Sequence, residues 1–344
     1  MIKLSFSTLM RIVTLMAACV LVGCGGASST VNPLTPTRII AFGDSFSTLD
    51  SVVPASGYAT YTVNTSETNA TVASRIATTY GFTMKHYTAS PSVVHASGTA
   101  YSYAAGTATS SDTKTQVQLY LSNGNTPGAS DLFIITAGTQ DIIAAAPTNN
   151  TTTIATAATA LTAAIQTLTN AGAQYVLVMQ PINVARTPPF LALNGVRPAG
   201  ANASYNSYAQ SLSYDSGTAC QSFSCLLSTK LNTAYPATSS HQPVLLVDLI
   251  SYFNLITGTT NTGSANTFGT YGVTNPDLVV CSTLVPGCTS SASDLATTST
   301  NQYTGSAWTY ATSVFAYSYY TTPYANRLMA DYIYNYNFYR AGWR

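Results

Sequence analysis

The chain has 344 residues, of which 46% are hydrophobic and only 7% are charged, with 12 Lys and Arg against 11 Asp and Glu. A chain of this length and apolar content can bury a sizeable core in one large domain or two ordinary ones. The near-zero net charge leaves no basic surface to neutralise phosphates, which argues against nucleic acid as a partner. A surface of Ser, Thr, Asn, Ala and Tyr fits a secreted or cell-surface protein better than a cytosolic one.

The first residues have the pattern of an export signal. Lys3 and Arg11 flank the start of an apolar run, "IVTLMAACVLVGC", that is too short to span a bilayer comfortably. Small or aliphatic residues stand directly before Cys24, which resembles the lipobox of bacterial lipoproteins. The resemblance implies a signal peptide over residues 1–23, a lipid on Cys24 and, because Gly25 follows, a place in the outer membrane or at the cell surface. An ordinary cleaved signal peptide is the alternative.

The next stretch, "GGASSTVNPLTPT", is rich in Gly, Ser, Thr and Pro and predicts a flexible tether over residues 24–37. After it, short apolar runs alternate with Ala- and Thr-rich amphipathic segments, a pattern typical of α/β proteins. The chain has no internal repeat and no second core, so we expect one domain over residues 38–344 and a monomeric protein.

The predicted elements follow one another along the chain as strands separated by helices. Strands are predicted at "RIIAF", "DLFIITAG", "QYVLVMQPI" and "QPVLLVDL", and helices at "SETNATVASRIATTYGF", "TTIATAATALTAAIQTLTNAGA", "SYNSYAQSLSY", "DLISYFNLI" and "PYANRLMADYIYNYNFYRAGW". The Gly-, Ser-, Thr- and Asn-rich stretches 105–128 and 257–305 are predicted to be long surface loops. We therefore expect a three-layer α/β/α fold, flavodoxin-like, with a mostly parallel sheet between two layers of helices.

Four cysteines remain beyond the export signal. Cys220 and Cys225 lie in "CQSFSC", and Cys281 and Cys288 lie in "CSTLVPGC". In an oxidising compartment these spacings predict two short-range disulfides. Pairing between the two segments is an open alternative. A metal site is another, although neither spacing is Cys-x-x-Cys and no histidine lies close in sequence.

Candidate functional residues follow the predicted strands, where parallel sheets gather their ligands. The chain offers "FGDSFSTLD" with Ser45, "SYAAGTA" with Gly106 and "TAGTQD" with Gln140, and later "VLVMQPINVARTPPF" and "YGVTNPDLVVC". From residue 38 to 344, these segments in this order resemble the blocks of the SGNH, or GDSL, hydrolase family. They are most similar to its bacterial phospholipase-, lecithinase- and haemolysin-like esterases.

The resemblance implies a serine esterase or lipase without metal or organic cofactor. In this family a Ser hydroxyl attacks an ester carbonyl, a His takes its proton and an Asp orients the His. The resemblance assigns Ser45 as the nucleophile and gives the Gly106 N–H and the Gln140 amide to the oxyanion hole. Gln140 stands where the family has Asn, and its stem is one methylene longer, so the donor must be re-aimed. Asp141 is assigned a structural role, bonding backbone N–H groups.

The segment before the last helix departs from the family. The family has Phe-x-Asp-x-x-His-x-Thr-Pro there, whereas this chain has "VFAYSYYTTP". Tyr317 stands at the position of the Asp, Tyr320 stands at that of the His, and a further family His one helical turn on is Asn326. A neutral tyrosine is a poor base near pH 7, because its phenol titrates at about 10. The sequence therefore predicts weak or lost activity.

Another histidine would have to replace that base, and the chain has only His86, His95 and His241. His241 precedes a predicted strand, at the end away from the site, and His86 is predicted to lie on the surface. His95 lies in the loop before Gly106 and is the least implausible substitute.

Three hypotheses account for these patterns. The first is a membrane-anchored esterase or lipase that acts on a small-molecule or lipid ester through Ser45. The second is a non-catalytic, ligand-binding pseudo-hydrolase on the same fold, and the third is a structural envelope protein. The chain has 24 Tyr against 2 Trp, which indicates packing of amphipathic helices, with an aromatic platform for glycans or acyl chains as the alternative.

Overall fold

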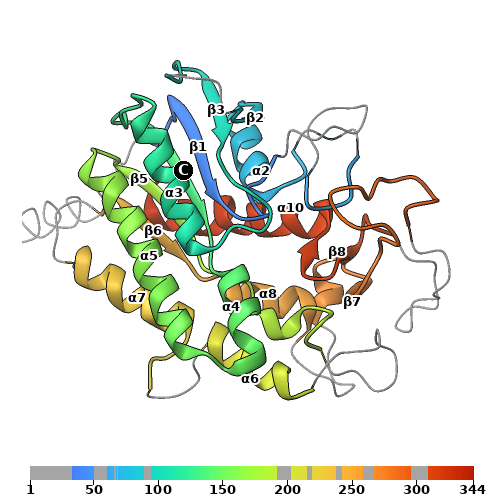
Figure 1. The fold of residues 1–344 in the computed structure, drawn as a ribbon. Coiled ribbons are helices and arrows are strands. Elements are labelled where there is room, and N and C mark those ends of the chain that lie inside the picture. The colour runs from blue at the N-terminus through green and yellow to red at the C-terminus, as the bar shows by residue number, and fades with distance from the viewer. Residues whose placement is uncertain are drawn as a thin grey trace, which may run out of the picture.

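The fold is taken from a computed structural model. It describes residues 33–49, 60–65, 67, 69–88, 94–191, 203–214, 219–237, 242–258, 267–295 and 309–344. The element labels below are those of Figure 1.

A six-stranded sheet forms the centre of the molecule, and every strand pair in it is parallel. Its strands run in the order β2-β3-β1-β4-β5-β6. Their bounds are β1 (Arg38–Gly43), β2 (Met84–His86), β3 (Thr99–Ser102), β4 (Leu132–Thr136), β5 (Tyr175–Met179) and β6 (Val244–Val247). The central strands β1, β4 and β5 are mostly apolar because helices cover both of their faces.

Helices form the two outer layers, with α3, α4, α5 and α7 in front of the sheet in Figure 1 and α10 behind it. The front layer holds α3 (Ser110–Ser122), α4 (Thr139–Ala145), α5 (Thr151–Asn170), α6 (Ala203–Ser213), α7 (Phe223–Ala234) and the short 3-10 turns η1 (Ala146–Thr148) and η2 (Val184–Arg186). The back layer holds α2 (Val72–Thr79), α8 (Leu249–Thr257), α10 (Pro323–Tyr332) and the π-helix η3 (Ile333–Phe338). The shortest helices are α9 (Thr267–Thr270) and α11 (Tyr339–Ala341). The predicted three-layer α/β/α fold is confirmed.

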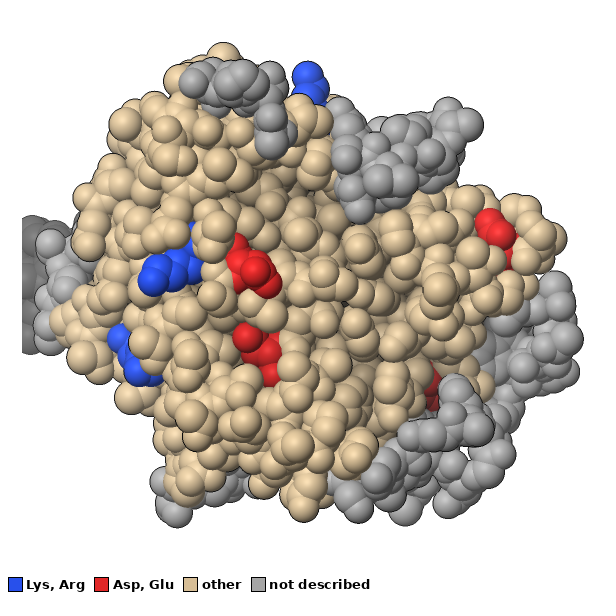
Figure 2. Space-filling view, viewed as in Figure 1, with Lys and Arg blue, Asp and Glu red and all other residues tan. Residues whose placement is uncertain are grey.

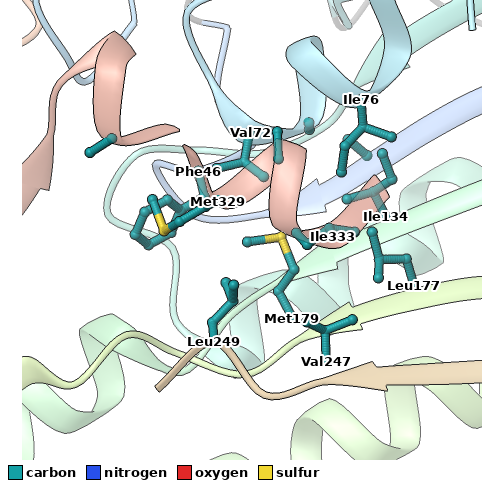
Figure 3. Close-up of a cluster of buried hydrophobic side chains, with 14 of the residues drawn as sticks. Phe46, Val72, Ile76, Ile134, Leu177, Met179, Val247, Leu249, Met329 and Ile333 are labelled. Atoms are coloured by element: carbon teal, nitrogen blue, oxygen red, sulfur yellow. The ribbon is translucent and has the colours of Figure 1, made fainter. Parts of the chain in front are cut away.

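Alternate side chains of each strand enter two separate cores. In β1, Ile39 and Ala41 face the back layer, whereas Ile40 and Phe42 face the front layer. Figure 3 shows the back core, in which side chains from the strands, α2, α8, α10 and η3 meet: Phe46, Val72, Ile76, Ile134, Leu177, Met179, Val247, Leu249, Met329 and Ile333. Both cores are continuous over several strands, which fixes the register of the strands between them.

A second, three-stranded sheet lies beside the first, at the right of Figure 1. It contains β7 (Asn275–Val279), β8 (Ser313–Tyr317) and β9 (Tyr320–Thr321). The β8–β9 pair is an antiparallel hairpin, and Tyr317 pairs with Tyr320 across it. β7 lies within the stretch 257–305, so the prediction of a loop over that whole stretch is wrong.

The predicted loop over 105–128 is also wrong, because α3 occupies Ser110–Ser122. The buried positions of this helix are Ser110, Thr113, Val117 and Tyr120. Two of these four residues are polar, so the hydrophobic periodicity that predicts a helix is weak. A capping box starts the helix, with the Thr109 side chain and Asp112 bonding each other's backbone N–H.

The cysteines form the two predicted short-range disulfides, Cys220–Cys225 and Cys281–Cys288. The alternative pairing between the segments is therefore wrong. Because all four sulfurs are bonded in pairs, their thiolates are not free to bind a metal. Cys24 lies outside the described residues.

The packed fold begins before β1. Leu34 is buried in the back core, and its N–H donates to the Trp343 carbonyl at 3.1 Å. The fold therefore takes in the last residues of the predicted 24–37 tether. Within the described part of the chain, no helix combines the length and apolarity needed to cross a membrane. Charged side chains are few and scattered on the face in Figure 2.

Candidate active site

Ser45 lies in the turn that follows β1, and it is buried. Gly43 enters the turn with a positive φ of 119°. Its N–H donates to Gln116 Oε1 at 2.6 Å, and Gln116 Nε2 donates to the Gly43 carbonyl at 3.1 Å. The Asp44 N–H donates to the Thr136 carbonyl of β4 at 2.8 Å. These bonds hold the backbone of Gly43 and Asp44 and thereby fix the position of Ser45, the next residue.

The Asp44 carboxyl shapes the same turn from inside. Its Oδ1 accepts the Phe46 N–H at 3.2 Å, whereas its Oδ2 is buried and has no hydrogen-bond partner among the described residues. Burial raises the pKa of the Asp44 carboxyl to about 7. The group is therefore close to half protonated at neutral pH, which lowers the negative charge beside Ser45.

Gly106 lies in the turn after β3, one of the two strands that pair with β1. The chain leaving β3 continues alongside β1, since the Ala105 N–H donates to the Gly43 carbonyl at 3.0 Å. A Cβ added to Gly106 would lie 2.1 Å from the ring of Tyr61. Glycine is therefore the residue that allows the Tyr61 ring to cover this turn, and Gly106 is buried beneath it.

Gln140 lies shortly after β4, the second strand that pairs with β1. It lies in the first turn of α4, which begins after Gly138 in the left-handed conformation. Gln140 Nε2 is buried and has no hydrogen-bond partner among the described residues. The next residue, Asp141, accepts bonds from the N–H and the hydroxyl of Ser110 at 2.9 and 2.8 Å, which agrees with its predicted structural role. The strand order thus brings the turns of Ser45, Gly106 and Gln140 to one edge of the sheet.

Tyr320 lies near the Ser45 turn. Its ring is 5.0 Å from that of Tyr61 and 4.4 Å from that of Tyr319, centroid to centroid. Burial raises the pKa of the Tyr320 phenol far above its usual value, and the charge of Asp44 adds to this rise. Tyr317, its partner across the hairpin, is half-buried against the small cluster around the Cys281–Cys288 disulfide.

Asn326 has a structural role in α10. Its side chain accepts a bond from the Thr321 hydroxyl at 2.6 Å and donates to the Ala70 carbonyl at 2.8 Å. Both of its polar atoms thus link the start of the last helix to the rest of the fold.

His95 lies at the opposite edge of the sheet from Ser45. Its carbonyl accepts a bond from Arg38, the first residue of β1, at 3.0 Å, whereas Ser45 is the second residue after the end of that strand. The length of β1, roughly 17 Å at about 3.3 Å per residue, separates the two. His95 Nε2 bonds to the Tyr103 hydroxyl at 2.6 Å, and burial lowers the pKa of the imidazole to about 4. His95 is therefore a neutral core residue and too distant to act on Ser45.

Of the other two histidines, His86 is among the described residues. His86 is the last residue of β2 and is half-buried in that strand, where the sequence predicted a surface position. β2 is separated from β1 by β3. His241 lies outside the described residues.

The pH dependence of stability follows from the buried state of His95. Because its pKa falls from about 6.5 in the unfolded chain to about 4, stability should drop as pH falls from about 6.5 to 4, by at most about 3 kcal/mol. Asp44 acts oppositely over the same range, because its raised pKa favours the folded state most below about pH 4.

The measurement is urea unfolding of the wild type and His95→Gln at pH 7 and pH 4.5. Between pH 7 and pH 4.5 the variant should lose less stability than the wild type, because glutamine at position 95 does not titrate. Equal losses in both proteins would contradict a buried neutral His95.

A comparison with known families decides the class of the chain. A model of the GDSL-like lipase/acylhydrolase family matches residues 39–270. The chain belongs to this family. The resemblance to the GDSL family is thereby confirmed, and an ester-hydrolase type of protein is supported. A search of curated proteins found no match.

Two residues that shape the candidate site were missed from the sequence. Gln116 clamps Gly43 from α3, and Tyr61 covers Gly106. Gln116 has no local motif and lies in a stretch predicted to be a loop. Tyr61 is one of many tyrosines, and only the missing side chain of Gly106 hints at a ring above it. The described residues contain no group of three or more His, Cys, Asp or Glu able to hold a metal ion.

Proposed function

We propose that this protein hydrolyses carboxylic esters by acyl transfer to Ser45. The observation that carries the proposal is the Gln140 amide, whose Nε2 is buried without a partner among the described residues. Such an unpaired donor destabilises the free protein by about 1–3 kcal/mol. An oxygen that gains negative charge during acyl transfer is the kind of partner it lacks.

The proposed reaction begins with attack of Ser45 Oγ on the ester carbonyl carbon, which moves negative charge to the carbonyl oxygen. The backbone N–H groups of Ser45 and Gly106 and the Gln140 amide would donate hydrogen bonds to that oxygen. The proton of the Ser45 hydroxyl passes to the departing alkoxide, so the alcohol leaves and an acyl-enzyme remains. Water then attacks the acyl carbon, which releases the carboxylic acid and returns a proton to Ser45. These steps require no cofactor.

Activation of the hydroxyl is the weak point of this site. Tyr320 stands where the family has its base, and burial raises the pKa of its phenol further, so it remains protonated and accepts a proton poorly. We therefore expect slow turnover. The same observation favours a second candidate, a non-catalytic protein that binds ester-like ligands at this site.

The test is hydrolysis of p-nitrophenyl acetate and butyrate by the wild type, Ser45→Ala and the control Ser122→Ala. Ser122 is exposed at the end of α3. We expect Ser45→Ala to be at least about tenfold slower than the wild type and Ser122→Ala to be unchanged, because only Ser45 would carry the acyl group. Equal rates for Ser45→Ala and the wild type would exclude Ser45 as nucleophile and leave the binding function.

We further propose that the protein is exported and anchored through a lipid on Cys24, in the outer membrane or at the cell surface, as a monomer. The "LVGC" segment and the low charge of the chain support this placement. In bacterial cells, Cys24→Ser should move the protein from the membrane fraction to the soluble fraction. An unchanged distribution would contradict lipid attachment at this residue.

A further inference from the structure

A polar cavity opens at the carboxyl ends of β5 and β6. Its volume is about 220 Å³. Six of its lining residues are Gln180, Tyr214, Ser222, Ser224, Ser228 and Asp248. Gln180 follows the last residue of β5, and Asp248 follows the last residue of β6. The cavity therefore belongs to the same edge of the sheet as Ser45.

Ser224 has a hydroxyl that the fold does not use. It lies in the first turn of α7, where the Ser222 side chain already caps the helix by accepting the Cys225 N–H at 3.2 Å. Ser224 is 6% exposed, and its Oγ has no hydrogen-bond partner among the described residues. A buried hydroxyl without a partner costs free energy, so a polar ligand group in the cavity would relieve that cost.

The other lining groups are also of the kind that donate and accept hydrogen bonds. Gln180 Nε2 donates to the Ser228 hydroxyl at 3.2 Å, which leaves the amide oxygen of Gln180 and the hydroxyl proton of Ser228 to face other partners. Asp248 caps α8 by accepting from the N–H and hydroxyl of Ser251 at 3.1 and 2.6 Å. Serine hydroxyls and amides match the hydroxyls of a sugar, which also donate and accept.

The charge of the lining argues against an anionic ligand. Among the described residues of the lining, Asp248 is the single charged side chain, so an anionic ligand would meet repulsion without a compensating cation. Tyr214 is the single aromatic side chain among the lining residues that the structure describes, and one ring does not form an aromatic cage for a quaternary ammonium group. The serine hydroxyls and the Gln180 amide match a neutral group with several hydroxyls better than an anion or a quaternary ammonium group.

The cavity lies within reach of the Ser45 site. β5 is two strands from β1 in the sheet, a distance of about 10 Å at the usual strand spacing. α7 also touches the Gln140 turn directly, since a Cβ added to Gly138 would lie 2.6 Å from the Phe223 ring. From this arrangement we infer that the cavity binds a neutral polyhydroxylated group, such as a sugar ring. Given the proposed ester hydrolysis, this group is the alcohol part of the substrate.

Binding is tested first, without catalysis. The probe is methyl β-D-glucopyranoside, titrated into the full-length wild type, Ser224→Ala and the control Ser122→Ala, with cyclohexylmethanol as a ring that carries a single hydroxyl and choline as a cation. We expect saturable binding of the glucoside to the wild type and Ser122→Ala, and about fivefold weaker binding to Ser224→Ala. Ser224→Ala should unfold at the same or a higher temperature than the wild type, because the lost hydroxyl had no partner.

Two kinds of result would overturn the inference. One is glucoside binding that is absent in the wild type or equal in Ser224→Ala. The other is binding of cyclohexylmethanol or choline in preference to the glucoside.

Turnover then separates this inference from the proposed function. The rates of hydrolysis of glucose 6-acetate and p-nitrophenyl acetate are measured for the wild type and Ser224→Ala. The rate with glucose 6-acetate, divided by the rate with p-nitrophenyl acetate, should be about fivefold lower in the variant than in the wild type. An unchanged ratio would overturn the inference and leave ester hydrolysis intact. Absence of turnover of both esters, with glucoside binding retained, would instead contradict the proposed function and leave the sugar site.

Discussion

Gly43→Ala is expected to prevent folding, or to lower the free energy of unfolding by more than about 4 kcal/mol. Gly43 has a φ of 119°, and an added Cβ would lie 1.7 Å from the carbonyl oxygen of Thr136 and 2.6 Å from its carbonyl carbon. These are backbone atoms of β4, and the same carbonyl accepts the Asp44 N–H. Neither side of this contact can move without separating β1 from β4.

The matched control for this prediction is Gly81→Ala. Gly81 also has a positive φ, 81°, but nothing lies within 4 Å of an added Cβ. The control therefore carries only the backbone cost, about 1–2 kcal/mol. Urea unfolding followed by circular dichroism measures both variants. Equal losses would show that the contact with Thr136 is relieved in solution, and the account of this turn would be wrong.

Restoring an acid–base pair should have the largest effect on activity. The double variant Tyr317→Asp/Tyr320→His is expected to raise p-nitrophenyl ester turnover by about a hundredfold or more, since loss of such a base typically costs several powers of ten. Tyr317 and Tyr320 are partners across the β8–β9 hairpin, so the new carboxylate can orient the new imidazole. Tyr320 also lies near Asp44 and Tyr61, at the Ser45 turn.

The control for this gain is Tyr317→Asn/Tyr320→Gln. It removes the same two rings and adds amides that cannot act as bases. It should leave turnover near the wild-type rate. A gain as large as that of the double variant would mean that opening the site, rather than supplying a base, limits the reaction.

The sequence predicted most of the central sheet and its helices, because their residues carry strong periodic signals. β1, β4, β5 and β6 are continuous apolar runs, and α5 is a long Ala- and Thr-rich helix that ends before Gly172. α3 escaped prediction because Ser110 and Thr113 stand at two of its four buried positions. β7 pairs with β8 from a distant part of the sequence, and β9 has only two residues, so local periodicity does not reveal these strands.

The candidate site was predicted in part. Short motifs located Ser45, Gly106 and Gln140, and the strand order of the parallel sheet places their turns at one edge. The groups that hold these turns come from elsewhere: Gln116 reaches Gly43 from α3, and Tyr61 reaches Gly106 from a separate segment. Such contacts depend on tertiary packing and leave no pattern in the local sequence.

The most direct test of the central claim is covalent labelling of Ser45. The wild type and Ser45→Ala are incubated with diethyl p-nitrophenyl phosphate, which phosphorylates nucleophilic serines, and the modified residue is mapped by mass spectrometry of peptides. We expect slow labelling of the wild type at Ser45 alone and no labelling of Ser45→Ala. Labelling at another residue would contradict the assignment of Ser45 as the nucleophile. The same holds if Ser45 stays unmodified in the double variant Tyr317→Asp/Tyr320→His under the same treatment.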